Sequence, residues 1–198
     1  MTRAEQKQVT RERLFQAALQ AFREHGVQAA RIEDIAAAVQ VSRGTFYFHF
    51  PTREAVLDQL LEEAEAELCT ALQALDADAP LTVVLETMAL AYAERWKDEP
   101  KLFVEVGLYG VRRTSKTVMV QERHGVREEL GRRFGLAEGQ LRPGLPPEVL
   151  ADFYLVNAFT VGLAWSRFAL LTGSANPDIP LAEALRLSAE LFLQGAGA

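Results

Sequence analysis

The sequence contains little of the chemistry that metal and disulfide sites need. Its 198 residues include one cysteine, Cys69, and three histidines, His25, His49 and His124. A single cysteine cannot form an intramolecular disulfide, and the histidines do not have the spacing of metal ligands. We therefore predict no metal site and no cofactor. We interpret Cys69 as a small packing residue, with a redox role as the alternative.

Patterns typical of enzymes are also missing. The sequence has no nucleophile elbow, no glycine-rich phosphate loop and no cysteine–histidine arrangement for nucleophilic attack. Carboxylates are abundant between residues 54 and 78, but they recur at helical spacing, as on a solvated helix face. We predict that the protein is not an enzyme.

Long apolar runs and a secretory leader are lacking too. No apolar run approaches the length of a membrane span, and the first eight residues carry charge without an apolar segment. Hydrophobic residues make up 49% of the chain and charged residues 24%, which excludes global disorder and allows a sizeable core. We expect a cytoplasmic protein with no membrane partner.

Charge is unevenly divided along the chain. Residues 1–53 hold eight Lys and Arg against five Asp and Glu, a net charge of +3. The remainder holds thirteen against twenty-two, a net charge of −9. A basic segment joined to an acidic one fits a protein that presents one end to phosphates. A solvated charged face gives the same numbers, so the division supports a nucleic-acid partner without establishing one.

The stretch from Val41 to Phe50 points to that partner more directly. Ser42 is a good N-cap, and a helix that begins after it places Phe46 and Phe50 one turn apart on an apolar stripe. A short turn separates this helix from another expected over 31–39. The pair is typical of a helix-turn-helix, in which the first residues of the second helix face base edges in the major groove of DNA.

The flanking sequence predicts helices throughout. Thr10 would cap a first helix that ends at His25 before Gly26. A fourth helix, from Arg53 to about Leu75, would join the two parts of the chain without a flexible linker. Further helices are expected over 81–97, from 100, over 114–134, over 148–171 and from 181, with the longest loop at 135–147. The predicted domains are 1–52 and 53–198.

Residues 10–61 resemble the N-terminal domain of TetR-type transcriptional repressors. The matching pieces are Phe22-x-x-x-Gly26, Ile32-x-Asp34-Ile35-Ala36, Val41-Ser42-x-Gly44-Thr45-Phe46-Tyr47-x-His49-Phe50 and Arg53-Glu54-x-x-Leu57. The resemblance implies an all-α homodimer of about nine helices. Its N-terminal three-helix domain would bind DNA, and its C-terminal helical domain would bind a small molecule and dimerise.

The resemblance also implies which residues bind DNA. Arg43 and Thr45 would meet bases and nearby phosphates, and Gly44 would allow a close approach of the backbone. Gln40 stands where the family commonly has glycine, which predicts either strain in the turn or a different turn. Arg31 replaces the usual cap of the second helix and is either a phosphate contact or a solvated side chain. The predicted DNA-binding set is Arg31, Ser42, Arg43, Gly44, Thr45, Tyr47, His49 and Arg53, the last three as phosphate contacts.

The C-terminal part carries aromatic side chains at helical spacing, as a small-molecule pocket does. A plain hydrophobic core gives the same stripe, so the pattern leaves both open. Asn157 is informative because a buried amide needs a partner. Arg112, with Arg113 and Lys116, would either attract an anionic ligand or form a solvated face. The predicted ligand-binding set is Met88, Tyr92, Trp96, Phe103, Tyr109, Arg112, Phe153, Asn157, Trp165 and Phe168.

The helix expected over 148–171 is apolar almost all round, so it must be buried on several sides. One face would contact its own core and another a second copy of the chain, which predicts a two-fold dimer with a four-helix interface. A monomer with a thicker core is the alternative. The predicted interface residues are Leu155, Phe159, Gly162, Leu185 and Phe192.

We therefore hypothesise a ligand-responsive repressor that binds a palindromic operator in double-stranded DNA as a homodimer. A small apolar or amphipathic effector, such as an acyl-CoA-like molecule, would release it. Repression rather than activation rests on the resemblance alone. A DNA-independent carrier of small molecules is the alternative from another functional class.

Overall fold

The computed structural model describes residues 2–116, 125–137, 139, 141, 144–172 and 179–197, with the backbone alone described at 111–116 and 172. Every regular element in these ranges is an α-helix, which confirms the all-α prediction. The nine helices are α1 (Arg3–His25), α2 (Ile32–Ala38), α3 (Arg43–His49), α4 (Glu54–Gln73), α5 (Leu81–Trp96), α6 (Pro100–Lys116), α7 (Val126–Leu136), α8 (Pro147–Thr172) and α9 (Leu181–Ala196).

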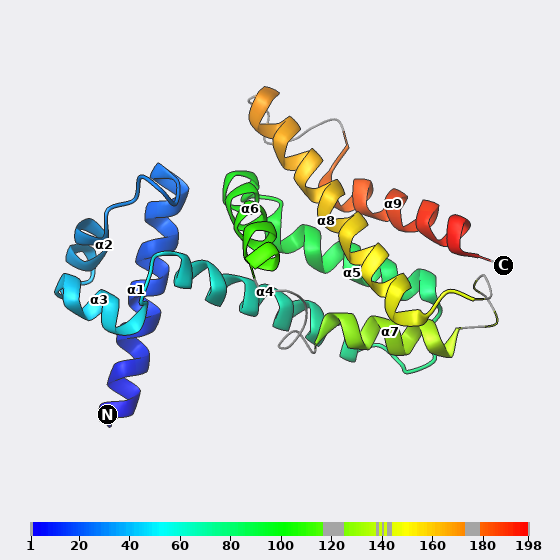
Figure 1. Ribbon diagram of the computed structural model, residues 1–198, viewed down its shortest axis with the longest axis horizontal. Helices are drawn as coiled ribbons and strands as arrows, with labels where there is room; N and C mark the ends of the chain where they lie inside the picture. Colours follow the sequence, from blue (N-terminus) through cyan, green and yellow to red (C-terminus); the bar gives the residue numbers. More distant parts are fainter. Residues whose placement is uncertain are drawn as a thin grey trace.

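The helices form two groups joined by one long helix (Figure 1). We call α1–α3 the head and α5–α9 the body. The helix α4 runs from the head into the body, and the two chain termini lie at opposite ends of the molecule. No flexible segment separates head from α4, because only residues 50–53 lie between α3 and α4.

The head buries the aromatic side chains that the sequence pattern predicted. Phe46 and Phe50 are fully buried with ring centroids 5.7 Å apart, and Phe50 stacks on Phe15 of α1 at 6.5 Å. Burial of each such side chain contributes about 1.5–3 kcal/mol. Other core side chains come mainly from α1 and α2, among them Leu14, Ala18, Phe22, Ile32, Ile35 and Ala36.

The first helix begins two turns earlier than predicted because its cap is Thr2 rather than Thr10. The Thr2 Oγ1 accepts a hydrogen bond from the Glu5 N–H, and the Glu5 carboxylate accepts one from the Thr2 N–H. This reciprocal capping box satisfies two backbone donors at the helix start. The predicted end is confirmed, since Gly26 follows α1 with φ +80°.

The turn between α2 and α3 carries the strain that Gln40 predicted. Its φ is 60°, in the left-handed region that costs a residue with a side chain about 1 kcal/mol. The turn is still fully bonded at this point, because the Gln40 N–H donates to Ala37 O and the Val41 N–H donates to Ala36 O. The departure from glycine therefore strains the turn without changing the helix-turn-helix.

A buried arginine fixes the body end of α4. Arg133 of α7 is only 3% exposed and donates hydrogen bonds to the carbonyls of Leu72, Leu75 and Asp76, at 2.7, 3.3 and 3.0 Å. These carbonyls belong to the last turn of α4 and the residues after it, which have no partner within the helix. Glu129 pairs with the same guanidinium at 2.7 Å and compensates its charge.

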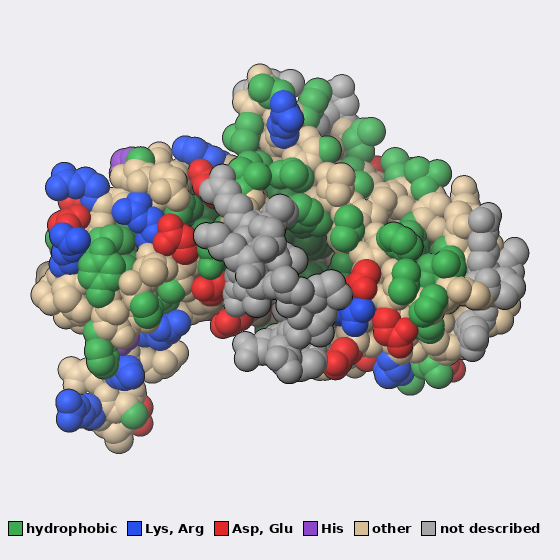
Figure 2. Space-filling model, viewed as in Figure 1, with side chains coloured by type: hydrophobic (Ala, Val, Ile, Leu, Met, Phe, Trp, Pro, Cys, Tyr) green, Lys and Arg blue, Asp and Glu red, His purple; other side chains and the backbone are tan. Residues whose placement is uncertain are grey.

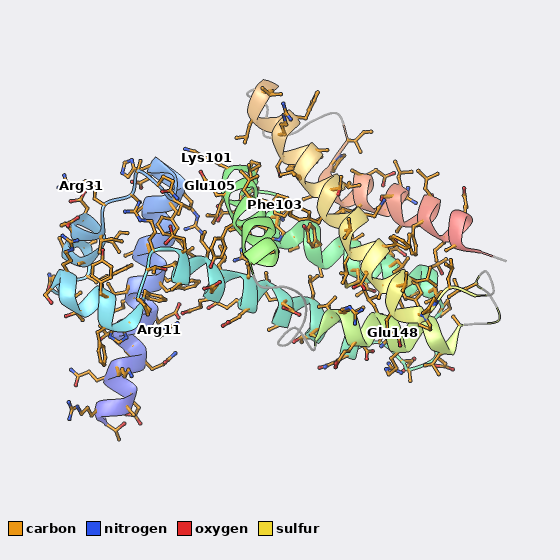
Figure 3. All side chains as sticks on the ribbon, in the orientation of Figure 1. Arg11, Arg31, Lys101, Phe103, Glu105 and Glu148 are labelled. Atoms are coloured by element: carbon orange, nitrogen blue, oxygen red, sulfur yellow. The ribbon has the colours of Figure 1, made fainter. Side chains whose placement is uncertain are left out.

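The helix α6 joins the body to the head. At its start, Glu99 forms an ion pair with Arg23 of α1 at 2.6 Å, and Lys101 donates to the Arg23 carbonyl. Farther along, the Tyr109 hydroxyl donates to Asp58 of α4 at 2.8 Å. Figure 3 shows Lys101 and Glu105 on the side of α6 that faces α1, and Phe103 on the side toward the body.

Two predicted features of the body are wrong. A single helix was expected over 114–134, but α6 extends to Lys116 and α7 begins only at Val126. Its arginines have separate roles there, since Arg133 is buried whereas Arg127 pairs with Asp152 at the surface. The expectation that no segment has the length of a membrane span also fails, because Pro147–Leu171 is long and apolar enough by length and composition. A core helix passes the same test, and α8 packs against α6, α7 and α9.

Candidate nucleic-acid interface

The first turn of α3 is closed by its own side chains. The Ser42 Oγ accepts a hydrogen bond from the Thr45 N–H at 3.1 Å, and it lies 2.9 Å from the Thr45 Oγ1. The predicted N-cap at Ser42 is therefore confirmed. Because the cap holds the first turn, the side chains of Arg43 and Thr45 start from a fixed backbone.

The guanidinium of Arg43 is exposed but held in place. It pairs with Glu33 of α2 at 2.8 Å, and its carbon lies 5.5 Å from the ring centroid of Tyr47 one turn later. A hydrogen bond with Tyr47 and the charge of Glu33 raise the pKa of Arg43 further above its usual value. An ion pair this exposed contributes little to stability, so a DNA phosphate or base can replace Glu33 as its partner.

No packing inside the chain requires a glycine at position 44. Gly44 is exposed, and a Cβ built there would meet only the Ser42 Oγ at 3.6 Å, an ordinary contact distance. The missing side chain therefore leaves free space on the outer surface of α3, between Arg43 and Thr45. This is the space that a close approach to a base edge or phosphate needs.

The other predicted contacts of α3 differ in exposure. Tyr47 is exposed and packs edge-on against Phe46. His49 is only 7% exposed, and its Nδ1 is buried without a hydrogen-bond partner in the described part of the chain. Burial first, and then the charges of Arg11 and Lys7, lower the pKa of His49. The imidazole of His49 therefore lies mostly inside the head, and its role toward phosphate stays a prediction.

The two arginines outside α3 also differ. Arg53 donates to the carbonyls of Val27 and Gln28, at 2.9 and 2.6 Å, and so closes the loop between α1 and α2. Arg53 therefore has a structural role in the head, and its contact with phosphate stays a prediction. Arg31 makes no side-chain cap on α2, as its replacement of Ser or Thr predicted, and its exposed side chain lies 4.0 Å from Asp34.

Sequence reasoning missed three residues beside the end of α3. Phe48 is 68% exposed on the side of α3 away from the core. Lys7 lies 4.9 Å from its ring centroid, and Arg11 lies 4.3 Å from that of Phe50 while donating to the His49 carbonyl. The capping-box pattern at Thr2 and Glu5 could have placed Lys7 on α1. The four-residue spacing of Lys7 and Arg11 would then have put both on one face.

In the body, the structure brings together only part of the predicted ligand-binding set. The ring of Phe103 lies at 5.8 Å from Tyr92, 5.2 Å from Trp96 and 5.9 Å from Phe159, and we call these four residues the aromatic cluster. Burial raises the pKa of Tyr92. Trp165 and Tyr109 belong to the same buried region. Met88 is buried in a separate core nearer α7 and α9, and the side chain of Arg112 lies outside the described residues.

Three predicted ligand residues lie on the opposite side of α8. Phe153 and Phe168 are 60% and 51% exposed, and Asn157 is exposed and accepts a hydrogen bond from Ser188 of α9. The expectation that they line an interior pocket is wrong for this structure. The inner side of α8 carries Leu150, Tyr154, Ala158 and Trp165 instead, at the four- and seven-residue spacing of one helix face.

The predicted interface residues are mostly interior. A Cβ on Gly162 would lie 3.0 Å from Phe103 and 3.1 Å from Tyr92, and one on Gly107 would lie 2.8 Å from Phe159. Leu185 is buried, and Leu155 and Phe192 pack against the second core. Their place in a dimer interface stays a prediction. The apolar side chains that are exposed on α8 and α9 include Val149, Phe153, Val156, Leu171, Leu187 and Leu191.

Known proteins share both the head and the whole arrangement. The family of bacterial regulatory proteins called tetR matches residues 14–60. The HTH-type transcriptional repressor DhaR of Mycobacterium sp. (strain GP1) is 28% identical over 156 residues, which cover 74% of this chain and 77% of DhaR.

Solved structures extend the likeness to the body. The repressor FadR of Thermus thermophilus, solved with lauroyl-CoA, has a TM-score of 0.64 at 26% identity and covers 93% of this chain and 94% of its own. SmeT, the repressor of a multidrug efflux pump of Stenotrophomonas maltophilia, has a TM-score of 0.65 at 22% identity. This match covers 97% of this chain and 92% of the SmeT chain. With the capped helix α3 described above, these likenesses support a TetR family transcriptional regulator, with the family match itself lying in the head.

Proposed function

We propose that this protein is a cytoplasmic repressor that binds a palindromic operator as a homodimer and is released by a small-molecule effector. The first turn of α3 carries the DNA-binding part of the proposal. Ser42 fixes this turn, Arg43 is exposed and positioned, and Gly44 leaves space for a close approach. In the major groove, these are the residues that would meet base edges and adjacent phosphates.

The homodimer is supported by the outer face of α8 and α9. Val149, Phe153 and Val156 are spaced four and three residues apart on α8, and Leu171 follows fifteen residues later on the same helix face; all four are exposed in the single chain. Leu187 and Leu191 continue the surface on α9. A second copy of the same face covers these side chains in a two-fold arrangement. We define Val149, Phe153, Val156 and Leu171 as the outer stripe.

The effector site is supported by the aromatic cluster. Four aromatic rings from α5, α6 and α8 meet there, and the missing side chains of Gly107 and Gly162 leave space for three of them. An apolar or amphipathic effector would bind there by replacing contacts between these rings with contacts between the rings and itself. The relative FadR was solved with lauroyl-CoA, which supports an acyl-CoA-like effector for this chain.

Release of DNA is supported by the position of α6. Phe103 on one side of this helix belongs to the aromatic cluster, while Glu99 at its start pairs with Arg23 of the head. An effector that displaces Phe103 shifts α6 and weakens this pair. The effector promotes release to the extent that it binds the shifted state more tightly than the DNA-bound state.

Selection of bound fragments from random DNA at physiological salt tests this function. We expect a palindromic consensus whose half-site centres lie about 34 Å apart, one turn of DNA. Arg43→Ala should relax the base preference at one position of each half-site. A folded dimer that enriches no sequence would contradict the proposal.

The effector is tested with the selected operator. Lauroyl-CoA, lauric acid and coenzyme A are titrated separately into the protein–DNA complex, and release is followed by fluorescence anisotropy. Release by lauroyl-CoA alone supports an acyl-CoA-like effector, and release by lauric acid as well makes the acyl chain sufficient. If none of the three releases DNA, the acyl-CoA-like assignment is wrong.

A further inference from the structure

The first two turns of α1 extend beyond the core of the head. Residues 2–9 are all exposed, whereas Leu14, Phe15, Ala18 and Phe22 farther along the helix are buried. The N-terminal end of α1 passes beside α3 and continues past it (Figure 1). A helix extension of this kind contributes no core packing, so its side chains are available for another role.

The inward face of this extension is basic. Arg3, Lys7 and Arg11 recur every four residues, and they continue the line on which Leu14 and Ala18 are buried. We call these three residues the basic stripe. At 100° per residue, Glu5 and Glu12 lie about 160° and 140° around the helix from Lys7. The acidic residues of this segment therefore face away from the basic stripe.

The basic stripe lies next to α3, the proposed recognition helix. Lys7 and Arg11 contact the rings of Phe48 and Phe50, and Arg11 also donates to the carbonyl of His49. Figure 3 shows Arg11 where α1 crosses the end of α3, and Figure 2 shows Lys and Arg side chains at the projecting N-terminal end. From Arg11 to Arg3 the helix rises about 12 Å, so positive charge continues well past α3.

Two cations of the extension have no ion-pair partner among the described residues. Arg43 has Glu33 as a partner, but neither Arg3 nor Lys7 forms an ion pair in the described ranges. A row of cations on the side of α1 next to α3 attracts a row of anions with comparable spacing. Double-stranded DNA offers such a row, with one charge per about 1.7 Å of its axis.

We propose that the basic stripe binds the DNA backbone beside each half-site, so that α1 lengthens the contact beyond the bases read by α3. This inference rests on the proposed function, because it assumes that α3 lies in the major groove. Lys7 and Arg3 bind phosphates and carry no base preference. Arg11 has a double role, since it also holds the His49 carbonyl.

The double variant Arg3→Gln with Lys7→Gln tests the proposal. Glutamine is a good helix former, so α1 keeps its length, which circular dichroism checks. We expect the slope of log K against log salt to become less steep by about 1.8 per protomer, at about 0.9 per phosphate contact. For a dimer, the advantage of the wild type over the variant then falls on the order of 100-fold between about 50 and 200 mM salt. Hydroxyl-radical protection should also shorten at the flanks of each half-site.

The matched control removes the same charge from the body. Lys97→Gln with Arg127→Gln changes two exposed cations far from α3 and should leave the salt slope unchanged. If the slope of the Arg3 and Lys7 variant equals that of the wild type, the proposal is wrong. A changed consensus sequence in that variant also overturns it, since phosphate contacts carry no base preference.

Failure of the proposed function is separate and concerns the wild type. If the wild type itself selects no sequence, the operator-binding function fails before the variants are compared. Binding of the wild type to vesicles of anionic phospholipid, lost in the double variant while DNA binding is kept, would assign the basic stripe to a membrane surface and overturn the DNA assignment.

Discussion

The head and the body of this protein leave their large apolar side chains exposed in different places. In the head, those that are exposed are Val9 and two residues of the recognition helix, Tyr47 and Phe48. In the body, they include the outer stripe of α8 and its neighbours on α9. The head therefore buries most of its large apolar side chains within one chain, whereas the body leaves an apolar surface exposed, which the proposed dimer would cover.

The two regions also use glycine in opposite ways. Gly44 has nothing but the Ser42 Oγ near its missing Cβ, and its space opens outward. Gly162 has Phe103 and Tyr92 against it, and its space is already filled by these rings. The space beside Gly44 is open to a binding partner, whereas the space beside Gly162 is filled by the rings of the aromatic cluster.

The largest effect on operator affinity is expected from a change in the proposed dimer interface of the body. Val156→Glu places a charge on the outer stripe, where a two-fold interface would bury it against its own symmetry mate. We expect a monomer and a loss of operator affinity of about 100-fold or more, because one head no longer assists the other. Sedimentation measures the mass, and a DNA titration measures the affinity.

Leu136→Glu is the matched control for this change. Leu136 of α7 is 64% exposed, against 63% for Val156, but it does not lie on α8 or α9. This variant should remain a dimer and bind the operator normally. A dimeric Val156→Glu protein with wild-type affinity would show that the body does not use this face.

A smaller effect is expected for Gly162→Ala in the body. The added Cβ would lie 3.0 Å from Phe103, so the ring must move, and such overpacking costs about 1–3 kcal/mol. Urea denaturation should show this loss, and effector binding should weaken with it. Gly195→Ala in α9, where nothing lies within 4 Å, should instead gain up to about 1 kcal/mol from helix propensity.

The corresponding change in the head, Gly44→Ala, should affect DNA and spare the fold. Its Cβ meets only Ser42 at 3.6 Å, so stability stays equal or rises. The methyl group occupies the space between α3 and DNA, and we expect about tenfold weaker operator binding, equivalent to about 1.4 kcal/mol. Unchanged affinity would mean that DNA does not approach α3 at this position.

The turn of the head can be relieved of strain. Gln40→Gly should raise the free energy of unfolding by about 1 kcal/mol, because glycine adopts the left-handed φ without a clash. Gln40→Ala keeps the strain and serves as the control, with no comparable gain in chemical denaturation. Equal stability of the two variants would place the strain elsewhere.

The smallest effect concerns the pH dependence of the head. Burial lowers the pKa of His49, so below pH 6.5 the unfolded chain binds a proton that the folded head resists. Stability must therefore fall as pH falls through this range. We expect His49→Gln to flatten the dependence between about pH 7 and 5.5, measured by urea denaturation at both values. An identical slope in the variant would assign the dependence to other groups.

The head was largely predictable from sequence because its determinants are local. The cap at Ser42, the stripe of Phe46 and Phe50, and the strained turn at Gln40 all lie within eleven residues, and each has its effect through neighbours in the chain. Arg53 was the exception. Its partners, the carbonyls of Val27 and Gln28, are more than twenty residues away and have no sequence signature.

The body was less predictable because α8 is apolar on most sides. Hydrophobicity alone cannot separate a face that packs inside the chain from one that packs on a second copy. Phe153 and Phe168, predicted as ligand-binding residues, are therefore exposed, while Phe159 and Gly162, predicted at the interface, contact Phe103 in the single chain. The tertiary contact between Phe103 of α6 and Phe159 shows which face of α8 packs inside the chain.

The arginine buried at the end of α4 gives the molecule a lever arm. Arg133 fixes one end of this helix to α7, and the other end carries the head. Twenty residues of helix span about 30 Å, so a tilt of about 5° around the fixed end moves the head by about 3 Å. That distance is comparable with the donor–acceptor distance of a hydrogen bond. An angular change too small to disturb the packing at the pivot is therefore enough to take α3 out of register with its bases.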